Sequence, residues 1–173
     1  MRTKLSASQK IVRSLFRLLE KQPYQTIRVK QICRAAKISR MTFYRHFRSK
    51  TAVVNYSFDV DFTIFIQRVA SSHFPTFNRI ATIFFTLIKQ RQARMELIFK
   101  NRLADLLLDR LEYYLSELID QRVLQTRERS SKLLIAMIAG GLTEVLATWI
   151  RGGMKMPVAS LVIFSSKYMH FKI

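Results

Sequence analysis

The chain has 173 residues, 49% of them hydrophobic, which is enough for a core of ordinary size. Its 30 Lys and Arg against 11 Asp and Glu give a formal net charge of +19, which favours an anionic partner such as nucleic acid. It has only four Gly and three Pro, too few for a sheet-rich fold. No Gly precedes Gly140, which excludes a phosphate-binding loop or a dinucleotide fingerprint before that point. The composition predicts an all-α protein.

Basic residues gather in the first part of the chain. Residues 1–50 hold 14 Lys and Arg and a single acid, Glu20, whereas residues 51–173 hold 16 basic and 10 acidic groups. A polyanion partner explains this asymmetry, because each phosphate contact releases condensed counterions. On charge alone, a solvated basic surface is an equally good explanation. The charge division therefore separates residues 1–50, the candidate region for binding a polyanion, from residues 51–173.

The apolar pattern predicts a series of helices. The first is expected from about Ser8, which can cap it, to Gln22, where Pro23 ends it. Ser49 can cap a long helix that continues to about Val69. The other predicted helices lie at about 28–36, 39–46, 75–90 (opened by Pro75), 93–100, 102–124, 130–151 and from Pro157 onward.

The short helices at 28–36 and 39–46 are the most informative pair. The second starts after Ser39, a good N-cap, and its apolar positions are Met41, Phe43 and Phe47. Side chains that donate hydrogen bonds stand between them. A short helix that buries one side and offers donors on the other fits the major groove of DNA, so the pair is interpreted as a helix-turn-helix. The donors are Arg40, Thr42, Tyr44, Arg45 and His46.

Residues 8–54, SQKIVRSLFRLLEKQPYQTIRVKQICRAAKISRMTFYRHFRSKTAVV, resemble the tetracycline-repressor (TetR) family of bacterial transcription regulators. TFYRHF followed by SK is the most specific part. The resemblance implies that the helix from Ser39 to His46 reads DNA, with Arg40 and Thr42 facing bases and with Tyr44, His46 and Lys50 on phosphates. The full set of residues expected to contact DNA is Arg28, Ser39, Arg40, Met41, Thr42, Tyr44, Arg45, His46 and Lys50.

Two residues depart from the family pattern. Arg28 stands where the family usually caps the second helix with Thr, and Lys37 stands where the turn usually has Gly. A Lys forced toward positive φ costs about 1 kcal/mol, so a slightly strained or reshaped turn is expected.

The resemblance implies a helix-turn-helix DNA-binding domain at 1–50 and a helical domain for effector binding and dimerisation at 51–173. Beyond residue 54 it is a resemblance of architecture, in which the last two helices would pair with those of a second subunit. Small residues such as Ala136 and Ala139 would let helices approach closely. A plain intramolecular core explains the same residues and stays open. The predicted dimer interface is Gly140, Gly141, Val145 and Trp149.

The middle helices are rich in Phe and Met, which tolerate repacking around a cavity. A plain hydrophobic core without a cavity would contain the same residues. Basic residues such as Arg94 and Arg102 would suit an anionic effector. The predicted effector pocket is Phe62, Phe65, Phe84, Met95, Phe99 and Tyr114.

Two functions therefore remain open. The first is a homodimeric transcription regulator, expected to be a repressor, that binds a palindromic operator in double-stranded DNA and is controlled by a small-molecule effector or a protein co-regulator. The second is a non-switching DNA-binding or protein-interaction module without an effector pocket.

The sequence contains no motif for metal binding or catalysis. His46, His73 and His170 have no partners at metal-ligand spacing, so no metal or other cofactor is expected, and no catalytic motif suggests an enzyme. The lone Cys33 fits a reducing cytoplasm. The N-terminus resembles an amphipathic helix rather than a signal peptide. The apolar stretch at 133–150 contains Glu144 and is interpreted as a buried helix, so the protein is expected to be cytoplasmic and to have no membrane partner.

Overall fold

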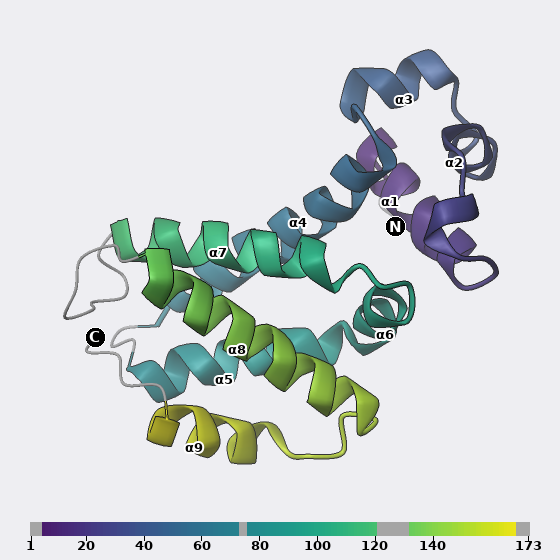
Figure 1. Ribbon diagram of the computed structural model, residues 1–173. Helices are drawn as coiled ribbons and strands as arrows, with labels where there is room; N and C mark the ends of the chain where they lie inside the picture. The colour runs from purple at the N-terminus through teal and green to yellow at the C-terminus, as the bar shows by residue number, and fades with distance from the viewer. Residues whose placement is uncertain (1–4, 73–75, 121–131, 169–173) are drawn as a thin grey trace.

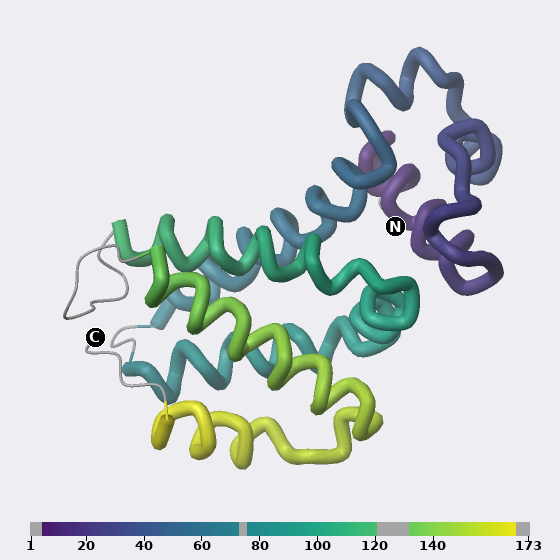
Figure 2. Tube along the Cα trace, viewed as in Figure 1, coloured from purple at the N-terminus to yellow at the C-terminus, as the bar shows by residue number. Residues whose placement is uncertain are grey.

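The computed structural model describes residues 5–72, 76–120 and 132–168, and all the regular structure in these ranges is helical. Figures 1 and 2 show a small head at one end and a larger body. The head consists of α1 (Ala7–Leu19), the one-turn 3-10 helix η1 (Tyr24–Thr26), α2 (Val29–Ala36) and α3 (Arg40–His46).

A long helix, α4 (Lys50–Ala70), leaves the head and continues into the body (Figure 1). In the body, α5 packs between α4 and α9, and α7 packs between α4 and α8. These layers confirm the predicted all-α fold class, with an N-terminal helix-turn-helix and a larger helical region after it. The remaining body helices are α5 (Phe77–Gln90), α6 (Gln92–Lys100), α7 (Ala104–Asp120), α8 (Lys132–Arg151) and α9 (Val158–Tyr168).

The first helix starts earlier than the sequence suggested. Ser6, not Ser8, is the N-cap, because Ser6 Oγ accepts from the Gln9 amide at 3.2 Å while the Ser6 amide donates to Gln9 Oε1 at 2.9 Å. The helix ends at Leu19, before the expected Gln22. Ser8 lies inside the helix, where its Oγ is 3.3 Å from His46 Nδ1.

The predicted caps of the next helices are confirmed. Ser39 Oγ accepts from the Thr42 amide at 3.0 Å, and Ser49 Oγ accepts from the Ala52 amide at 3.1 Å. Thr76 caps α5, whereas the expected opening residue Pro75 lies outside the described residues. The expected helix boundaries at residues 124 and 130 also lie outside the described residues.

The two departures at α2 have different consequences. Arg28 gives no side-chain cap, but its own amide donates to Gln31 Oε1 at 2.7 Å, so a glutamine supports the start of the helix instead. Lys37 ends α2 in the left-handed conformation, with φ 55° and ψ 50°. The predicted positive φ at Lys37 is therefore confirmed, and the turn keeps the geometry that a glycine normally supplies.

Among the described residues, α8 is the one helix that is long and apolar enough to cross a membrane by length and composition. In the fold, α8 packs along α7 and buries residues such as Ile135, Ile138 and Leu146. Length and composition alone are weak evidence for a membrane span, because the core helix of a soluble protein passes the same test.

Replacing Lys37 with Gly should raise the free energy of unfolding by about 1 kcal/mol, because Gly has no Cβ to strain at this backbone geometry. Lys37→Ala is the matched control: it removes the same charge but keeps the Cβ, and should give no gain. Urea unfolding of both variants measures the difference. Equal stability of the two variants would contradict strain at this turn.

Candidate nucleic-acid interface and core cavity

Two aromatic rings anchor α3. Phe43 is fully buried, and the buried Phe47 lies edge-on against Tyr56 of α4, with ring centroids 5.3 Å apart. This packing fixes which side of α3 faces the protein. The other side is exposed, and the residues there are Arg40, Met41, Tyr44, Arg45 and His46.

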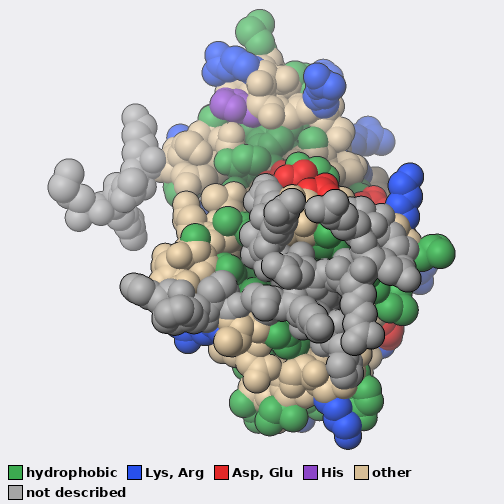
Figure 3. Space-filling model, turned by 90° about the vertical axis from the view of Figure 1, so that its left-hand side faces the viewer, with side chains coloured by type: hydrophobic (Ala, Val, Ile, Leu, Met, Phe, Trp, Pro, Cys, Tyr) green, Lys and Arg blue, Asp and Glu red, His purple; other side chains and the backbone are tan. Residues whose placement is uncertain are grey.

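Most of the predicted DNA-contacting residues thus lie together on one exposed surface. Figure 3 shows Lys, Arg and His side chains at the top of the molecule, where the head lies. Met41 is 82% exposed, so it is not one of the apolar positions that pack against the head, although it remains in the predicted DNA-contacting set. Arg28 is exposed at the start of the neighbouring α2.

The hydroxyl groups of Ser39 and Thr42 are only partly available for DNA. Ser39 Oγ caps α3 and lies 2.9 Å from Thr42 Oγ1. His46 approaches Ser8 through Nδ1, so Nε2 is the ring nitrogen left for a phosphate. The phenol of Tyr44 is half exposed, and its ring lies edge-on to Phe43, with centroids 5.4 Å apart.

Lys50 has a different role from the predicted phosphate contact. Its ammonium donates to the backbone carbonyls of Tyr24 at 2.6 Å and Ile27 at 2.9 Å, with Gln25 O at 3.3 Å. The same ammonium lies 4.2 Å from the centre of the Tyr24 ring. Because an ammonium has three donors, these carbonyls engage all of them. The structure therefore gives Lys50 a positioning role, in which it holds η1 against α4, and its phosphate contact stays a prediction.

A second contact joins η1 to the body. The Tyr24 amide donates to the buried Asn101 Oδ1 at 3.0 Å, and the Tyr24 hydroxyl lies 2.9 Å from Thr51 Oγ1. Burial raises the pKa of Tyr24, so this hydroxyl keeps its proton. No sequence signal pointed to Asn101, because 77 positions separate it from Tyr24.

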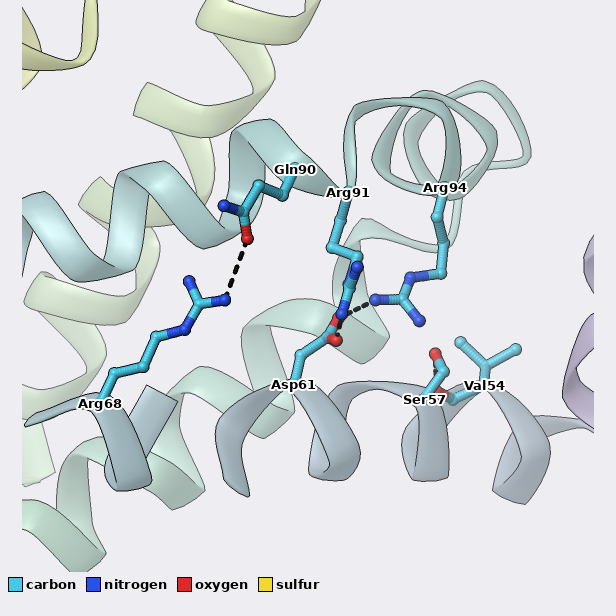
Figure 4. Close-up of polar contacts among 7 residues, drawn as sticks. All are labelled: Val54, Ser57, Asp61, Arg68, Gln90, Arg91 and Arg94. Atoms are coloured by element: carbon cyan, nitrogen blue, oxygen red, sulfur yellow. Dashed lines mark hydrogen bonds and ion pairs between the residues drawn. The ribbon is translucent and has the colours of Figure 1, made fainter. Parts of the chain in front are cut away.

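Charged groups connect α4 to α6 and α7. Asp61 of α4 accepts from Arg91 Nε at 3.0 Å and from Arg94 (Figure 4). Asp59, two residues earlier, accepts from Arg110 and from the hydroxyl of Tyr114. These contacts link α6 and α7 to α4 through two different sides of that helix.

Arg94 is central to this arrangement. It lies 5.8 Å from the ring centre of Phe16 of α1, so it contacts the head as well as Asp61. Burial lowers its pKa to about 10, which still leaves it charged at neutral pH. Arg94 is therefore engaged within the protein.

A cavity of about 140 Å³, partly open to the surface, lies among the helices of the body and is lined by residues of α4 to α9. Five of the six residues predicted for an effector pocket line it, namely Phe62, Phe65, Phe84, Met95 and Tyr114. Phe99 does not. Arg102, considered for an anionic effector, lies instead beside a separate hollow between the α1–η1 turn and the α6–α7 turn.

The predicted dimer residues divide into two groups. Trp149 is only 5% exposed, donates from Nε1 to Met156 O at 3.0 Å, and lies edge-on to Phe85. The protomer's own core thus buries Trp149, and its predicted place in a dimer interface stays a prediction. Gly141 is exposed and Gly140 and Val145 are half-buried. A Cβ added at either glycine would meet no atom within 4 Å, so this face of α8 is open in the protomer.

Comparison with known proteins agrees with this architecture. Residues 11–56 match the family described as bacterial regulatory proteins, tetR family. The crystal structure of Lin0861 from Listeria innocua is 16% identical and superposes with a TM-score of 0.78 over 98% of this chain and 97% of that chain. No curated protein sequence matches significantly.

Two further structures share the fold. The dihydroxyacetone kinase operon activator DhaS is 18% identical, with a TM-score of 0.60 over 95% of this chain and 94% of that chain. The fatty acid degradation regulator FadR from Bacillus halodurans is 20% identical, with a TM-score of 0.55 over 93% of each chain. At these identities the likeness shows the fold alone.

Lys50→Ala should lower the free energy of unfolding by about 2 kcal/mol, because the η1 carbonyls lose a charged donor. Arg48→Ala, which removes an exposed charge two residues away, is the control and should change stability by less than about 0.5 kcal/mol. Thermal and urea unfolding compare them. A Lys50→Ala protein as stable as the control would contradict the positioning role and favour phosphate contact as the role of Lys50.

Proposed function

We propose that this chain, a member of the tetR family of bacterial regulatory proteins, acts as a dimeric repressor that binds a palindromic operator and is released by a small-molecule effector. It is a DNA-binding regulator, and we assign it no catalytic role and no cofactor. As a regulator of bacterial DNA, it acts in the cytoplasm. The single observation that carries the proposal is the exposed face of α3, anchored from behind by Phe43 and Phe47.

The roles proposed for that face follow from its chemistry. Arg40, in the first turn of α3, can make a bidentate contact to guanine in the major groove. Tyr44, Arg45 and His46 are then placed toward the other end of the same short helix, where we assign them to phosphates together with Arg28 of α2. Met41 and the methyl of Thr42 offer apolar contact to a thymine methyl.

Exposed apolar side chains on α8 and α9 support a second copy of this chain as the partner. On α8, Leu133 is 82% exposed and Met137 is 69% exposed, and both lie in line with Gly141 at helical spacing. On α9, Ile163 and Phe164 are also exposed. Large exposed apolar patches on soluble proteins mark interaction sites. One head reads one half-site, so a palindromic operator requires two heads.

The body cavity supports control by a ligand. Its lining includes Phe58, Phe62 and Phe65 of α4, the helix that Lys50 fixes to the head at its other end. A ligand that fits one placement of α4 better than another would change the separation of the two heads and hence operator affinity. A non-switching module, or control by a protein co-regulator, would show the same DNA binding with no response to any small molecule.

Arg40→Ala should relax the sequence preference at one base pair of each half-site and cost about 1–3 kcal/mol of operator binding. Selection from random duplexes defines the preferred site of the parent protein, and the variant is then carried through the same selection. Arg68→Ala, the same charge loss at the far end of α4, is the control and should leave the preferred sequence unchanged. An Arg40→Ala protein with an unaltered preference would overturn the proposed role of Arg40.

Tyr44→Ala should behave differently from Arg40→Ala. Loss of a phosphate contact lowers affinity for every duplex by a similar factor, because phosphates carry no base identity. Fluorescence anisotropy with the selected site and with an unrelated duplex measures both affinities. A loss confined to the selected site would instead place Tyr44 on a base.

Gly141→Arg should convert the dimer to a monomer with much weaker operator binding, because an arginine at this open position would enter the second copy. Position 141 is exposed and a Cβ there meets no atom of the protomer within 4 Å, so the fold should survive. Ala93→Arg on the exposed side of α6 adds the same charge elsewhere and should leave the dimer intact. Analytical ultracentrifugation decides between the two outcomes, and a dimeric Gly141→Arg protein would exclude this face of α8.

A further inference from the structure

The cavity in the body is almost entirely apolar. Its lining of Phe, Leu, Ile, Ala and Met side chains is interrupted at three places only among the described residues, by Asp61 of α4, Tyr114 of α7 and Ser165 of α9. None of the described lining residues is a Lys, Arg or His. The hydrogen-bonding state of the three polar side chains therefore decides what the cavity can recognise.

Asp61 and Tyr114 are already engaged. The carboxylate of Asp61 accepts from Arg91 and Arg94, which neutralise it. The hydroxyl of Tyr114 donates to Asp59, and burial is the main reason that its pKa is raised, so it keeps the proton it donates. Neither group therefore needs a ligand to satisfy its hydrogen bonds.

Ser165 is the exception. It is 2% exposed, and its Oγ has no hydrogen-bond partner in the described part of the chain. Leaving a buried hydroxyl unsatisfied is costly, whereas a ligand atom placed in the cavity would satisfy it. Ser165 belongs to α9, which packs on α5, whereas Asp61 belongs to α4. The two polar side chains therefore reach the cavity from different helices.

We propose that the cavity binds a small neutral molecule with a compact apolar body and one hydroxyl or carbonyl group, which hydrogen-bonds to Ser165 Oγ. The inference rests on the proposed function, since it gives the chemical class of the effector assigned to this cavity. The volume of about 140 Å³ sets the size. An apolar cavity of about 150 Å³ in another protein holds benzene, so the body should have about six to eight carbon atoms.

The lining of the cavity disfavours ligands that carry a charge. A carboxylate ligand would lose its hydration without meeting a cation among the described lining residues, because Arg94 is held by Asp61 and Arg102 lies at another hollow. An ammonium ligand would have to displace two arginines from Asp61. A neutral ligand avoids both costs, which argues against the anionic effector that the basic residues suggested.

Isothermal titration of the full chain with four probes tests the inference. Benzyl alcohol has the proposed chemistry, toluene lacks the hydroxyl, and benzoate and benzylammonium carry the two charges. Benzyl alcohol should bind, benzoate and benzylammonium should not bind measurably, and Ser165→Ala should weaken benzyl alcohol about fivefold while leaving toluene unchanged. Ser160→Ala, on the exposed side of the same helix, is the matched control and should bind all four probes as the parent does.

A second variant locates the site. Ala81 lines the cavity and is buried, so Ala81→Leu should fill it and abolish binding of both neutral probes. Three outcomes would overturn the inference: no binding of benzyl alcohol, equal binding by the parent and Ser165→Ala, or preferential binding of benzoate. Because Ser165→Ala is a small change, the result does not depend on the filled variant folding.

Operator binding measured on the same samples separates this inference from the proposed function. Ser165-dependent binding of benzyl alcohol with no effect on operator affinity would support the cavity's chemistry and remove its effector role. Operator binding without any binding of benzyl alcohol would overturn the inference and leave the DNA-binding assignment standing.

Discussion

The contact between Lys50 and the η1 carbonyls is the one on which the arrangement of head and body depends. Lys50 is the first residue of α4, and its ammonium holds the backbone of Tyr24 and Ile27. Asn101 holds the same turn from the end of α6. Because α4 is one continuous helix, the Lys50 contact and the α4 residues that line the cavity belong to the same element.

The acidic residues of α4 give the body its distribution of charge. Asp59 and Asp61 engage Arg91, which precedes α6, Arg94 of α6 and Arg110 of α7, so these basic groups are paired within the protein and partly buried. The interior is left with an apolar cavity beside these pairs. The basic side chains of α3 have no acidic neighbour on their own helix and remain directed to solvent. The net charge of the chain is thus presented to a polyanion mainly by the head.

Packing also separates two kinds of residue on α8. Trp149 turns inward and completes the core against Phe85, whereas Leu133 and Met137 stay exposed on the opposite stripe. An exposed apolar row on one side of a well-packed helix is costly in water, which is why a second copy of the chain is a reasonable partner for it. Glu144 and Arg151 pair at the polar end of the same stripe, where they would border that partner.

The sequence by itself determined the helical fold, the helix-turn-helix with its Ser39 cap, and the strained turn at Lys37, because periodicity, caps and positive φ are local properties. It also named five of the residues that line the cavity, since large apolar residues on adjacent helices tend to meet. Only the tertiary structure decided that Lys50 binds backbone carbonyls, that Trp149 is buried in its own protomer, and that Ser165 lacks a partner. These facts depend on which groups from distant segments come within hydrogen-bonding distance. The spacing of residues along the sequence does not predict such distances.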